Sequence, residues 1–337
     1  MGSVRARVYV TLFVVVVTLS WFFSTVLTSE PAIANLGPPI TVASNEPIDP
    51  IPLEVEFDAE RASLGRKLFE DPLLSSNNAV ACASCHVLDQ AAIDPRGKSI
   101  GVNGEERPLN SPTMFNSQFQ FRQFWTGQAE TNADAVAGPL LSPKGLGATW
   151  SEVLEKLNNS PEYKRLFKSA YREGITEATV KDAIFTFERS LFTPNSKFDQ
   201  FLRGDANALT NNEKEGYRRF KAYGCASCHQ GVLLGGNLFQ KTGIFGNYAQ
   251  DRGNETDADL GRFNVTEDEN DRYVFKVPGL RNINETAPYF HDGNVETLEE
   301  AVKLMATYQL GRSINQTDVD LIVEFLKTLT GEMEVIS

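Results

Sequence analysis

The fold of this chain is decided by two short stretches, ACASCH at residues 81–86 and GCASCH at residues 224–229. They contain all four cysteines of the 337-residue sequence, arranged as two Cys-x-x-Cys-His motifs. At this spacing two thiols reach the two vinyl groups of one haem, and the histidine that follows binds its iron. The sequence therefore predicts two covalently bound haem c groups, each held by two cysteines and one histidine: Cys82, Cys85 and His86, then Cys225, Cys228 and His229.

Three other uses of paired cysteines compete with haem attachment: a redox dithiol, two disulfides, and a zinc site built from both pairs. The pairs of a zinc ribbon lie closer together in sequence, and a redox dithiol does not need a following histidine twice. Export from the cytoplasm, predicted below, also favours haem, because c-type haem is attached outside the cytoplasm, where free thiols tend to oxidise. Together these points favour haem at both motifs.

One structural plan is repeated around the motifs. A helical pattern with Gly65 and Phe69 leads to the first motif, and a second pattern with Gly216 and Phe220 leads to the other. No stretch of the sequence makes a comparable case for a strand. Apolar residues at helical spacing predict helices in six stretches: residues 58–69, 150–171, 177–191, 211–223, 295–308 and 317–329.

These patterns predict a mainly α fold of two cytochrome c-like haem domains. The N-terminal domain is assigned to residues 57–200 and the C-terminal domain to residues 201–337, because a polar stretch near this point separates two apolar helical patterns. The connections at residues 94–113 and 231–254 are longer than usual loops. Such long connections need a bound group to fold around.

The first residues carry an export signal. Two arginines precede an uncharged apolar run over residues 8–27, and the triplet Ala-Ile-Ala at residues 32–34 offers a small-residue cleavage site. We interpret residues 1–34 as a signal peptide, with an N-terminal membrane anchor as the alternative, because about 20 apolar residues also span a bilayer. A proline-rich linker follows at residues 35–56. The predicted location of the mature protein is the periplasm.

The charge of the chain is distinctly acidic. The formal net charge is -12, and removal of the predicted signal peptide takes away two arginines and one glutamate, which leaves -13. This balance argues against nucleic-acid binding and suits association with a basic electron carrier. Simple solubility is the alternative explanation.

The histidine count restricts how the two irons are bound. The chain has three histidines, and only His291 remains once each motif has used its own. At most one haem can therefore have two histidine ligands. Methionine is the other common axial ligand, and the candidates beyond residue 34 are Met114, Met305 and Met333. Periodicity alone favours core packing for Met305, which shares a helix face with apolar residues.

Further motifs accompany the haem motifs in one order: NSPTMFN at residues 110–116, FWTG at 124–127, GP at 138–139, APYFHDG at 287–293 and FLKTLTG at 325–331. Together with the two Cys-x-x-Cys-His motifs, this order resembles the bacterial di-haem cytochrome c peroxidases over residues 57–331. That family also includes the maturation enzyme that oxidises tryptophans of methylamine dehydrogenase.

The resemblance implies further site residues. Met305 matches the methionine that binds the C-terminal haem iron in the peroxidases, where the tryptophan-oxidising relatives carry a tyrosine. Trp125 matches a tryptophan that relays electrons between the haems, with a plain core aromatic as the alternative. Arg281 matches a position expected to balance a haem propionate. A calcium ion between the domains is implied at three matching positions, for which turn chemistry is the alternative: Asn110, Thr286 and Pro288.

One expected residue is missing. Family members carry a glutamate shortly after the Gly-Pro pair, and it moves a proton as the O–O bond of peroxide breaks. The alignment puts Gly145 at this position and Ala135 at that of a preceding glutamine. Either another acid, such as Glu130 or Asp134, reaches the site, or the N-terminal haem does not cleave peroxide.

The sequence thus predicts a periplasmic di-haem c-type cytochrome that acts as a peroxidase. It would reduce hydrogen peroxide at the N-terminal haem with electrons that a small c-type cytochrome or copper protein delivers to the C-terminal haem. Two alternatives stay open. A di-haem electron-transfer protein without peroxidase turnover is favoured by the missing glutamate, and a protein-modifying di-haem oxidase is disfavoured by Met305. A homodimer is among the expected assemblies.

Overall fold

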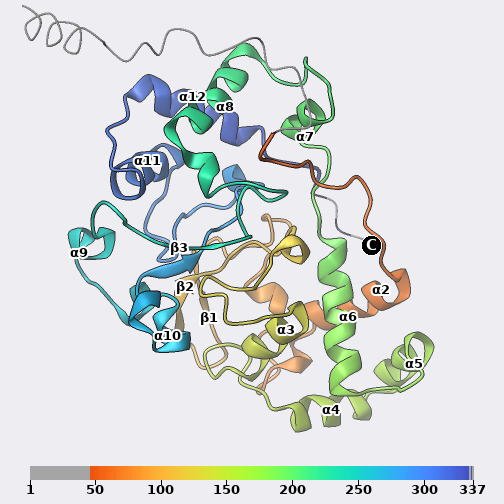
Figure 1. The fold of residues 1–337 in the computed structure, drawn as a ribbon. Helices are drawn as coiled ribbons and strands as arrows, with labels where there is room; N and C mark the ends of the chain where they lie inside the picture. Colours follow the sequence, from red (N-terminus) through yellow and green to blue (C-terminus); the bar gives the residue numbers. More distant parts are fainter. Residues whose placement is uncertain (1–45, 334, 336–337) are drawn as a thin grey trace, which may run out of the picture. The chain divides into compact units, whose positions relative to one another are not determined.

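The computed structural model describes residues 46–333 and residue 335. Its α-helices are α2 (Ala59–Glu70), α3 (Asn132–Leu141), α4 (Trp150–Asn159), α5 (Pro161–Ala170), α6 (Glu177–Ser190), α7 (Lys197–Leu202), α8 (Asn211–Tyr223), α9 (Tyr248–Arg252), α10 (Phe263–Thr266), α11 (Leu298–Leu304) and α12 (Gln316–Lys327). Its strands are β1 (Lys98–Ile100), β2 (Glu106–Asn110), β3 (Phe239–Lys241) and β4 (Val274–Lys276). The predicted mainly helical fold is confirmed (Figure 1).

Four short strands are a part of the fold that the sequence did not predict. β1 pairs with β2 and β3 pairs with β4, both antiparallel. None is longer than 5 residues, so alternation of polar and apolar side chains has no length over which to appear. These two ribbons matter for the site, because β2 ends at Asn110 and β4 ends at Lys276.

Each half of the fold is built on a crossing of two helices. α2 packs against α6, and α8 packs against α12. A Cβ atom on Gly65 would lie 1.9 Å from the Ala183 carbonyl oxygen, and one on Gly216 would lie 2.0 Å from the Leu321 carbonyl oxygen. Both crossings therefore need glycine at the contact, because no other residue lets the backbones approach this closely. The glycine repeat in the sequence is a repeat of helix packing.

Aromatic side chains fill the core beside both crossings. In the N-terminal half, the Phe69 and Phe187 rings have centroids 5.3 Å apart. Beside the crossing of α8 and α12, Phe325 contacts Phe198 of α7 and Tyr217 of α8, each at a centroid distance of 5.0 Å. All five side chains are almost fully buried. Burial of each such ring contributes roughly 1.5–3 kcal/mol, so these contacts fix the two helix pairs.

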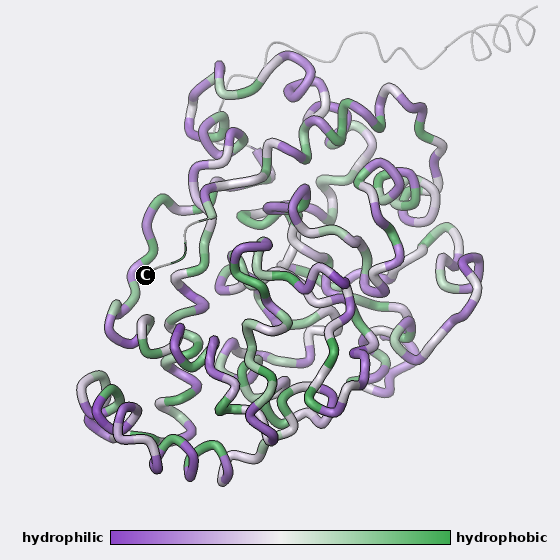
Figure 2. The backbone as a smooth tube through the Cα atoms, turned by 180° about the vertical axis from the view of Figure 1, so that it is seen from behind, coloured by the Kyte–Doolittle hydropathy of each residue, from purple (hydrophilic) through white to green (hydrophobic). Residues whose placement is uncertain are grey.

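One predicted helix is two helices in the structure. The sequence predicts a single helix over residues 150–171, but α4 ends at Asn159 and α5 begins at Pro161. The Ser160 hydroxyl accepts a hydrogen bond from the Tyr163 N–H, and the proline takes the first helical position, where its missing N–H costs nothing. Both helices are amphipathic, and Figure 2 shows hydrophilic and hydrophobic residues alternating along their coils.

The N-terminal segments lie partly outside the described residues. The predicted signal peptide at residues 1–34 and the first part of the predicted linker are both outside. The rest of the linker contacts α7, where Ile51 is buried and its N–H donates to Asp199 Oδ1 at 3.1 Å. Within the described part of the chain, no helix is both long and apolar enough to cross a membrane. The boundary between residues 200 and 201 stays a prediction.

Candidate functional site

A cavity of about 640 Å³ brings the predicted site residues together. Segments from both halves line it, including parts of β2, β3 and β4. The predicted residues in its lining are Cys82, Cys85, His86, Asn110, Trp125, Cys225, Cys228, His229, Arg281, Thr286, Pro288 and Met305. These twelve residues therefore border one space, while their individual roles stay predictions. Met333, the third candidate methionine, packs against the hydrophobic core of the N-terminal half and is not in the lining.

The two cysteine motifs have the same local structure. Each begins with a short 3₁₀ turn, Cys82–Ser84 in one half and Cys225–Ser227 in the other. The His86 N–H donates to the Cys82 carbonyl at 3.0 Å, and the His229 N–H donates to the Cys225 carbonyl at 2.9 Å. All four cysteines are free thiols that border the cavity. The disulfide alternative has no support in this arrangement, and all four thiols can reach a bound haem.

Both motif histidines are prepared to bind iron through Nε2. His86 Nδ1 lies 3.2 Å from the Ala92 carbonyl oxygen, and His229 Nδ1 lies 3.0 Å from the Leu234 carbonyl oxygen. A carbonyl oxygen only accepts, so the ring proton is on Nδ1 and Nε2 keeps its lone pair. Burial lowers the pKa of His86 to about 4 and also lowers the pKa of His229. Both rings are therefore neutral at pH 7, as an iron ligand requires.

The charges around the cavity fit haem propionates. Among the described residues that line it, the only carboxylate is Glu188, although the chain as a whole is acidic. The anionic propionates of haem need cations beside them, because a buried charge is costly unless it is paired. The lining cations are Arg107, Lys144, Lys241, Lys276 and Arg281. The residues present therefore fit haem in both thiol content and charge.

Met305 lies where a helix changes its winding. The sequence predicts one helix over residues 295–308, but α11 ends at Leu304 and a π-helical turn, Met305–Gln309, follows. Such turns inside helices are rare and often accompany functional sites. Of the other two candidate methionines, Met114 also lines the cavity, and its N–H donates to the same Ala92 carbonyl that supports His86. Met114 therefore belongs to the histidine side of the N-terminal half.

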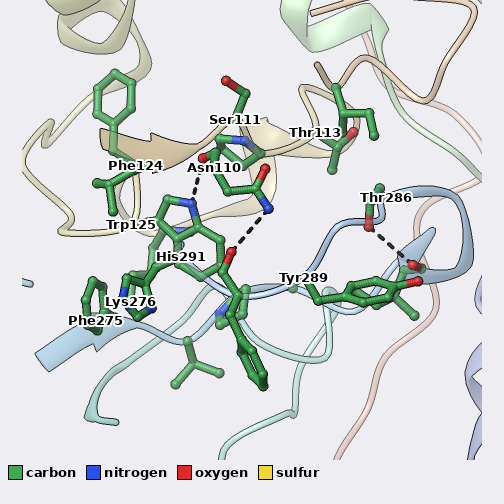
Figure 3. Close-up of a pocket in the computed structure, with 18 of the residues that line it drawn as sticks. Asn110, Ser111, Thr113, Phe124, Trp125, Phe275, Lys276, Thr286, Tyr289 and His291 are labelled. Atoms are coloured by element: carbon green, nitrogen blue, oxygen red, sulfur yellow. Dashed lines mark hydrogen bonds between the residues drawn. The ribbon is translucent and has the colours of Figure 1, made fainter. Parts of the chain in front are cut away.

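Trp125 is held by segments of both halves. Its Nε1–H donates to the Asn110 carbonyl oxygen at 2.9 Å, and its own carbonyl accepts from the Lys276 N–H at 2.8 Å. The Trp125 and His291 rings meet edge to face with centroids 6.5 Å apart. Figure 3 shows the indole beside Asn110, Lys276 and His291 at the cavity wall. The ring is thus fixed in orientation at the junction of the halves.

Asn110 links the two halves at the predicted calcium position. Its Nδ2 donates to the Pro288 carbonyl at 2.6 Å and to the Phe290 carbonyl at 3.1 Å (Figure 3). An amide turned over would present its oxygen beside the same carbonyls, which is the type of ligand set that Ca²⁺ takes. The Thr286 hydroxyl donates to the Ile283 carbonyl at 3.3 Å. The residues are compatible with calcium, whose binding stays a prediction.

Arg281 is fully engaged with protein partners. Its guanidinium pairs with Asp199 at 2.9 Å and donates to the Val232 and Asp49 carbonyls at 2.9 and 3.0 Å. Both Arg281 and Asp199 are buried. Arg281 therefore ties the N-terminal arm and α7 to the cavity wall, and a contact with a propionate stays a prediction.

Neither of the acids suggested from the sequence lies at the cavity. Glu130 is exposed and pairs with Arg122 at 2.8 Å. Asp134 is exposed in the first turn of α3, where it accepts from the Thr131 hydroxyl at 2.6 Å. Neither appears in the cavity lining. The structure therefore does not support either residue as the acid that replaces the missing glutamate.

Gly145 has no room for a side chain. A Cβ atom here would lie 2.1 Å from the Pro139 carbonyl oxygen. This carbonyl accepts from the Leu146 N–H at 2.9 Å, so the turn folds back tightly on the end of α3. A glutamate at residue 145 would therefore need a different backbone path in this turn.

Two buried groups were missed from the sequence. Glu188 of α6 lines the cavity, and burial raises its pKa to about 8. Asp259 lies 2.8 Å from His291 Nε2, and Arg252 bridges Asp259 and Asp292. Glu188 follows the periodicity of a helix, and Asp259 sits in an acid-rich stretch, so neither has a distinguishing sequence signal.

Known proteins are similar over most of the chain. The family profile described as di-haem cytochrome c peroxidase matches residues 59–207. Cytochrome c peroxidase Ccp of Escherichia coli is 47% identical over 85% of this chain, which spans 62% of the length of that protein. Cytochrome c551 peroxidase of Nitrosomonas europaea is 45% identical, and the match covers 86% of each chain. Among solved structures, a MauG-like protein associated with microbial copper homeostasis has a TM-score of 0.74 and 29% identity, over 88% of this chain and 96% of the other.

The helical fold and the two haem motifs on one cavity define a di-haem protein. The chain belongs to the di-haem cytochrome c peroxidase family. The resemblance inferred from the sequence is thereby confirmed, and so is haem as the cofactor. The methylamine utilization proteins MauG are also relatives, with 30% identity over 253 residues in one case.

Proposed function

We propose that this chain is a peroxidase that reduces hydrogen peroxide to two molecules of water, using two protons and two electrons from a redox partner. The observation that carries the proposal is an asymmetry in the described cavity lining: the C-terminal half contributes Met305 from a π-helical turn, whereas the methionine of the N-terminal half, Met114, has its N–H bonded to the carbonyl that supports His86. The similarity to cytochrome c peroxidases at 45–47% identity supports it.

Haem, when bound, supplies iron that changes its oxidation state. The thiols of both motifs support covalent attachment of c-type haem, because each pair borders the cavity beside its histidine. His86 and His229 would bind the two irons through Nε2, and Met305 would complete the C-terminal site. Methionine ligation favours the reduced state, so the C-terminal half suits the acceptance of electrons.

Trp125 is the residue that we assign to electron transfer between the halves. Its ring donates a hydrogen bond to β2 and its backbone carbonyl accepts one from β4, so both the ring and its attachment point are held at the junction. We propose calcium at Asn110, Thr286 and Pro288, where it would join the loop around residue 288 to β2. Removal of calcium with a chelator is then expected to slow electron transfer between the halves without releasing haem.

Location and partners follow from the charge and the N-terminal segment. We propose export to the periplasm by residues 1–34, either cleaved or kept as an anchor. The net charge of -12 supports a basic donor such as a small c-type cytochrome, with a copper protein as the other class. Mass spectrometry of the exported protein tests cleavage: a mature N-terminus after Ala34 supports a signal peptide, and intact peptides from residues 1–34 establish an anchor. A homodimer is proposed as the assembly.

Steady-state peroxide consumption with a reduced cytochrome donor tests the activity. We expect turnover in the wild type and its loss in His86→Gly, with the C-terminal haem still reduced by the donor. Rapid reduction of both haems without peroxide consumption would instead establish the second candidate, a di-haem electron carrier. That candidate is supported by one observation, the absence of a carboxylate from residues 139–146.

A further inference from the structure

Arg107 is the charged side chain of β2 that points into the cavity. Its neighbours Glu106 and Pro108 are exposed, whereas Arg107 and Leu109 are half-buried. Of the two charged residues of β2, Arg107 lines the cavity and Glu106 does not. This alternation follows from the period of two in a strand. Burial lowers the pKa of the Arg107 guanidinium, but arginine stays charged at any physiological pH.

The guanidinium lies beside the turn that lacks an acid. Arg107 Nη1 is 3.2 Å from the place where a Cβ atom of Gly145 would be. The neighbouring cation, Lys144, has its Nζ 3.9 Å from Glu105 and a half-exposed side chain. Arg107 is thus the charged group that occupies the space next to Gly145, where the family alignment places a glutamate side chain.

Arg107 has no partner of its own. Among residues 46–333 and residue 335, none forms an ion pair with it or accepts a hydrogen bond from it. Glu188, the only carboxylate in the described lining, interacts electrostatically with Cys82, whereas Arg107 interacts with Cys85 and His86. A half-buried cation with free donors in the lining of a cavity is suited to bind an anion.

We propose that Arg107 makes the N-terminal half of the cavity, beside the turn that contains Gly145, a binding site for small anions. His86 is supported by residues 86–93, while Arg107 and the turn at residues 142–146 come from other segments of the same half. The forked guanidinium donates hydrogen bonds and charge but cannot take up a proton. The site therefore recognises the charge of its ligand, and where the proposed peroxidase function holds, that ligand includes the hydroperoxide anion.

A haem propionate is the other anion that Arg107 can meet. The two assignments differ in what they change. An arginine bound to a propionate alters the potential of the haem and is not available to added ligands. An arginine at the anion site alters the affinity for charged ligands and leaves the affinity for neutral ones unchanged.

Ligand titration of the oxidised holoprotein separates these assignments. Sodium fluoride is the anionic probe and imidazole at pH 8 is the neutral probe, with binding to the N-terminal haem followed by absorbance. For Arg107→Gln we expect roughly 10- to 100-fold weaker fluoride binding, the effect of losing a charge-assisted hydrogen bond, and less than about 3-fold change for imidazole. Lys98→Gln is the control: it removes a charge from the neighbouring strand β1 at a residue outside the cavity lining, and we expect less than about 3-fold change for either probe.

An unchanged ratio of fluoride to imidazole affinity in Arg107→Gln would overturn the proposal, and so would a shifted haem potential with unchanged fluoride affinity. If Arg107→Gln does not retain haem, the fluoride affinity of Arg107→Lys is measured instead. A lysine lacks the forked donors, so fluoride binding at least about 3-fold weaker supports the site and unchanged binding overturns it. A wild type that binds fluoride through Arg107 but does not consume peroxide would reject the proposed function and keep the anion site.

Discussion

The two halves of the molecule support their histidines in the same way and differ in the other segments that line the cavity. In each half, a phenylalanine ring lies beside the motif histidine: Phe69 and His86 have centroids 6.5 Å apart, and Phe220 and His229 have centroids 6.4 Å apart. In each half Nδ1 is also held by a backbone carbonyl. The repeat thus covers the helix crossing, the cysteine motif and the histidine.

The segments outside this repeat make the two halves different. The C-terminal half presents Met305 from a π-helical turn, and the N-terminal half presents Arg107 and a turn that admits no side chain at Gly145. A fully ligated iron suits electron transfer, because it binds nothing new, and an iron with one open position suits reaction with a small molecule. With the proposed ligands, the repeated scaffold would carry two different iron sites, and the segments outside the repeat would set the difference.

The largest expected effect concerns the shared part of the two halves. We expect Gly65→Ala and Gly216→Ala each to lower the free energy of unfolding by about 3 kcal/mol, because each added methyl overlaps a backbone carbonyl. Chemical denaturation of the holoprotein measures both changes. Gly138→Ala in α3 is the control, since its Cβ would meet only the Phe124 ring at 3.8 Å. If the two variants lost unequal amounts of unfolding free energy, the two helix crossings would not be equivalent.

The second-largest expected effect concerns the proposed methionine ligand, which distinguishes the two halves. We expect Met305→Leu to lower the potential of the C-terminal haem by on the order of 100 mV, within the roughly 0.8 V range that axial ligands control. Potentiometric titration measures it. Met114→Leu should leave both potentials unchanged, because Met114 lies on the histidine side. If both variants behave alike, Met305 is not a ligand.

A smaller effect is expected where the halves meet. Asn110→Ala removes two hydrogen bonds to the loop at residues 288–290 and leaves its buried carbonyls unpaired, at a cost of about 2 kcal/mol. Thermal unfolding measures the loss, and a chelator reveals any calcium contribution. Full stability in this variant, with and without chelator, would show that Asn110 does not join the halves.

The smallest expected effect concerns the phenylalanine that lies beside each motif histidine. Phe69→Leu and Phe220→Leu each keep an apolar side chain beside the histidine, so we expect each to cost about 1 kcal/mol. Denaturant midpoints of the two variants should agree closely. A much larger loss of stability in one variant would show that the two phenylalanines do not stabilise their halves in the same way.

Much of the fold was predictable because its causes are local. The helices that carry the haem motifs have strong periodicity and capping residues, and the glycine at each crossing repeats in the sequence. The helix break at Ser160 was missed, since amphipathic periodicity runs on across it. The short strands were missed because their pairing partners lie far apart in sequence or within long loops.

The site was predictable where motifs or family order marked it. All of the predicted haem and calcium positions border one cavity. Arg107, Glu188 and Asp259 were not found, because their importance arises from burial and from neighbours distant in sequence. The two acids suggested near the Gly-Pro pair failed for the same reason: closeness in sequence did not bring Glu130 or Asp134 to the cavity.

The most direct test of the difference between the halves is the stoichiometry of carbon monoxide binding to the fully reduced holoprotein. Carbon monoxide binds reduced haem iron only where a ligand position is open. We expect one molecule per chain in the wild type, bound in the N-terminal half, and two per chain in Met305→Leu, where the second position is also opened. Two molecules per chain in the wild type, or none, would contradict the assignment of one closed and one open iron position.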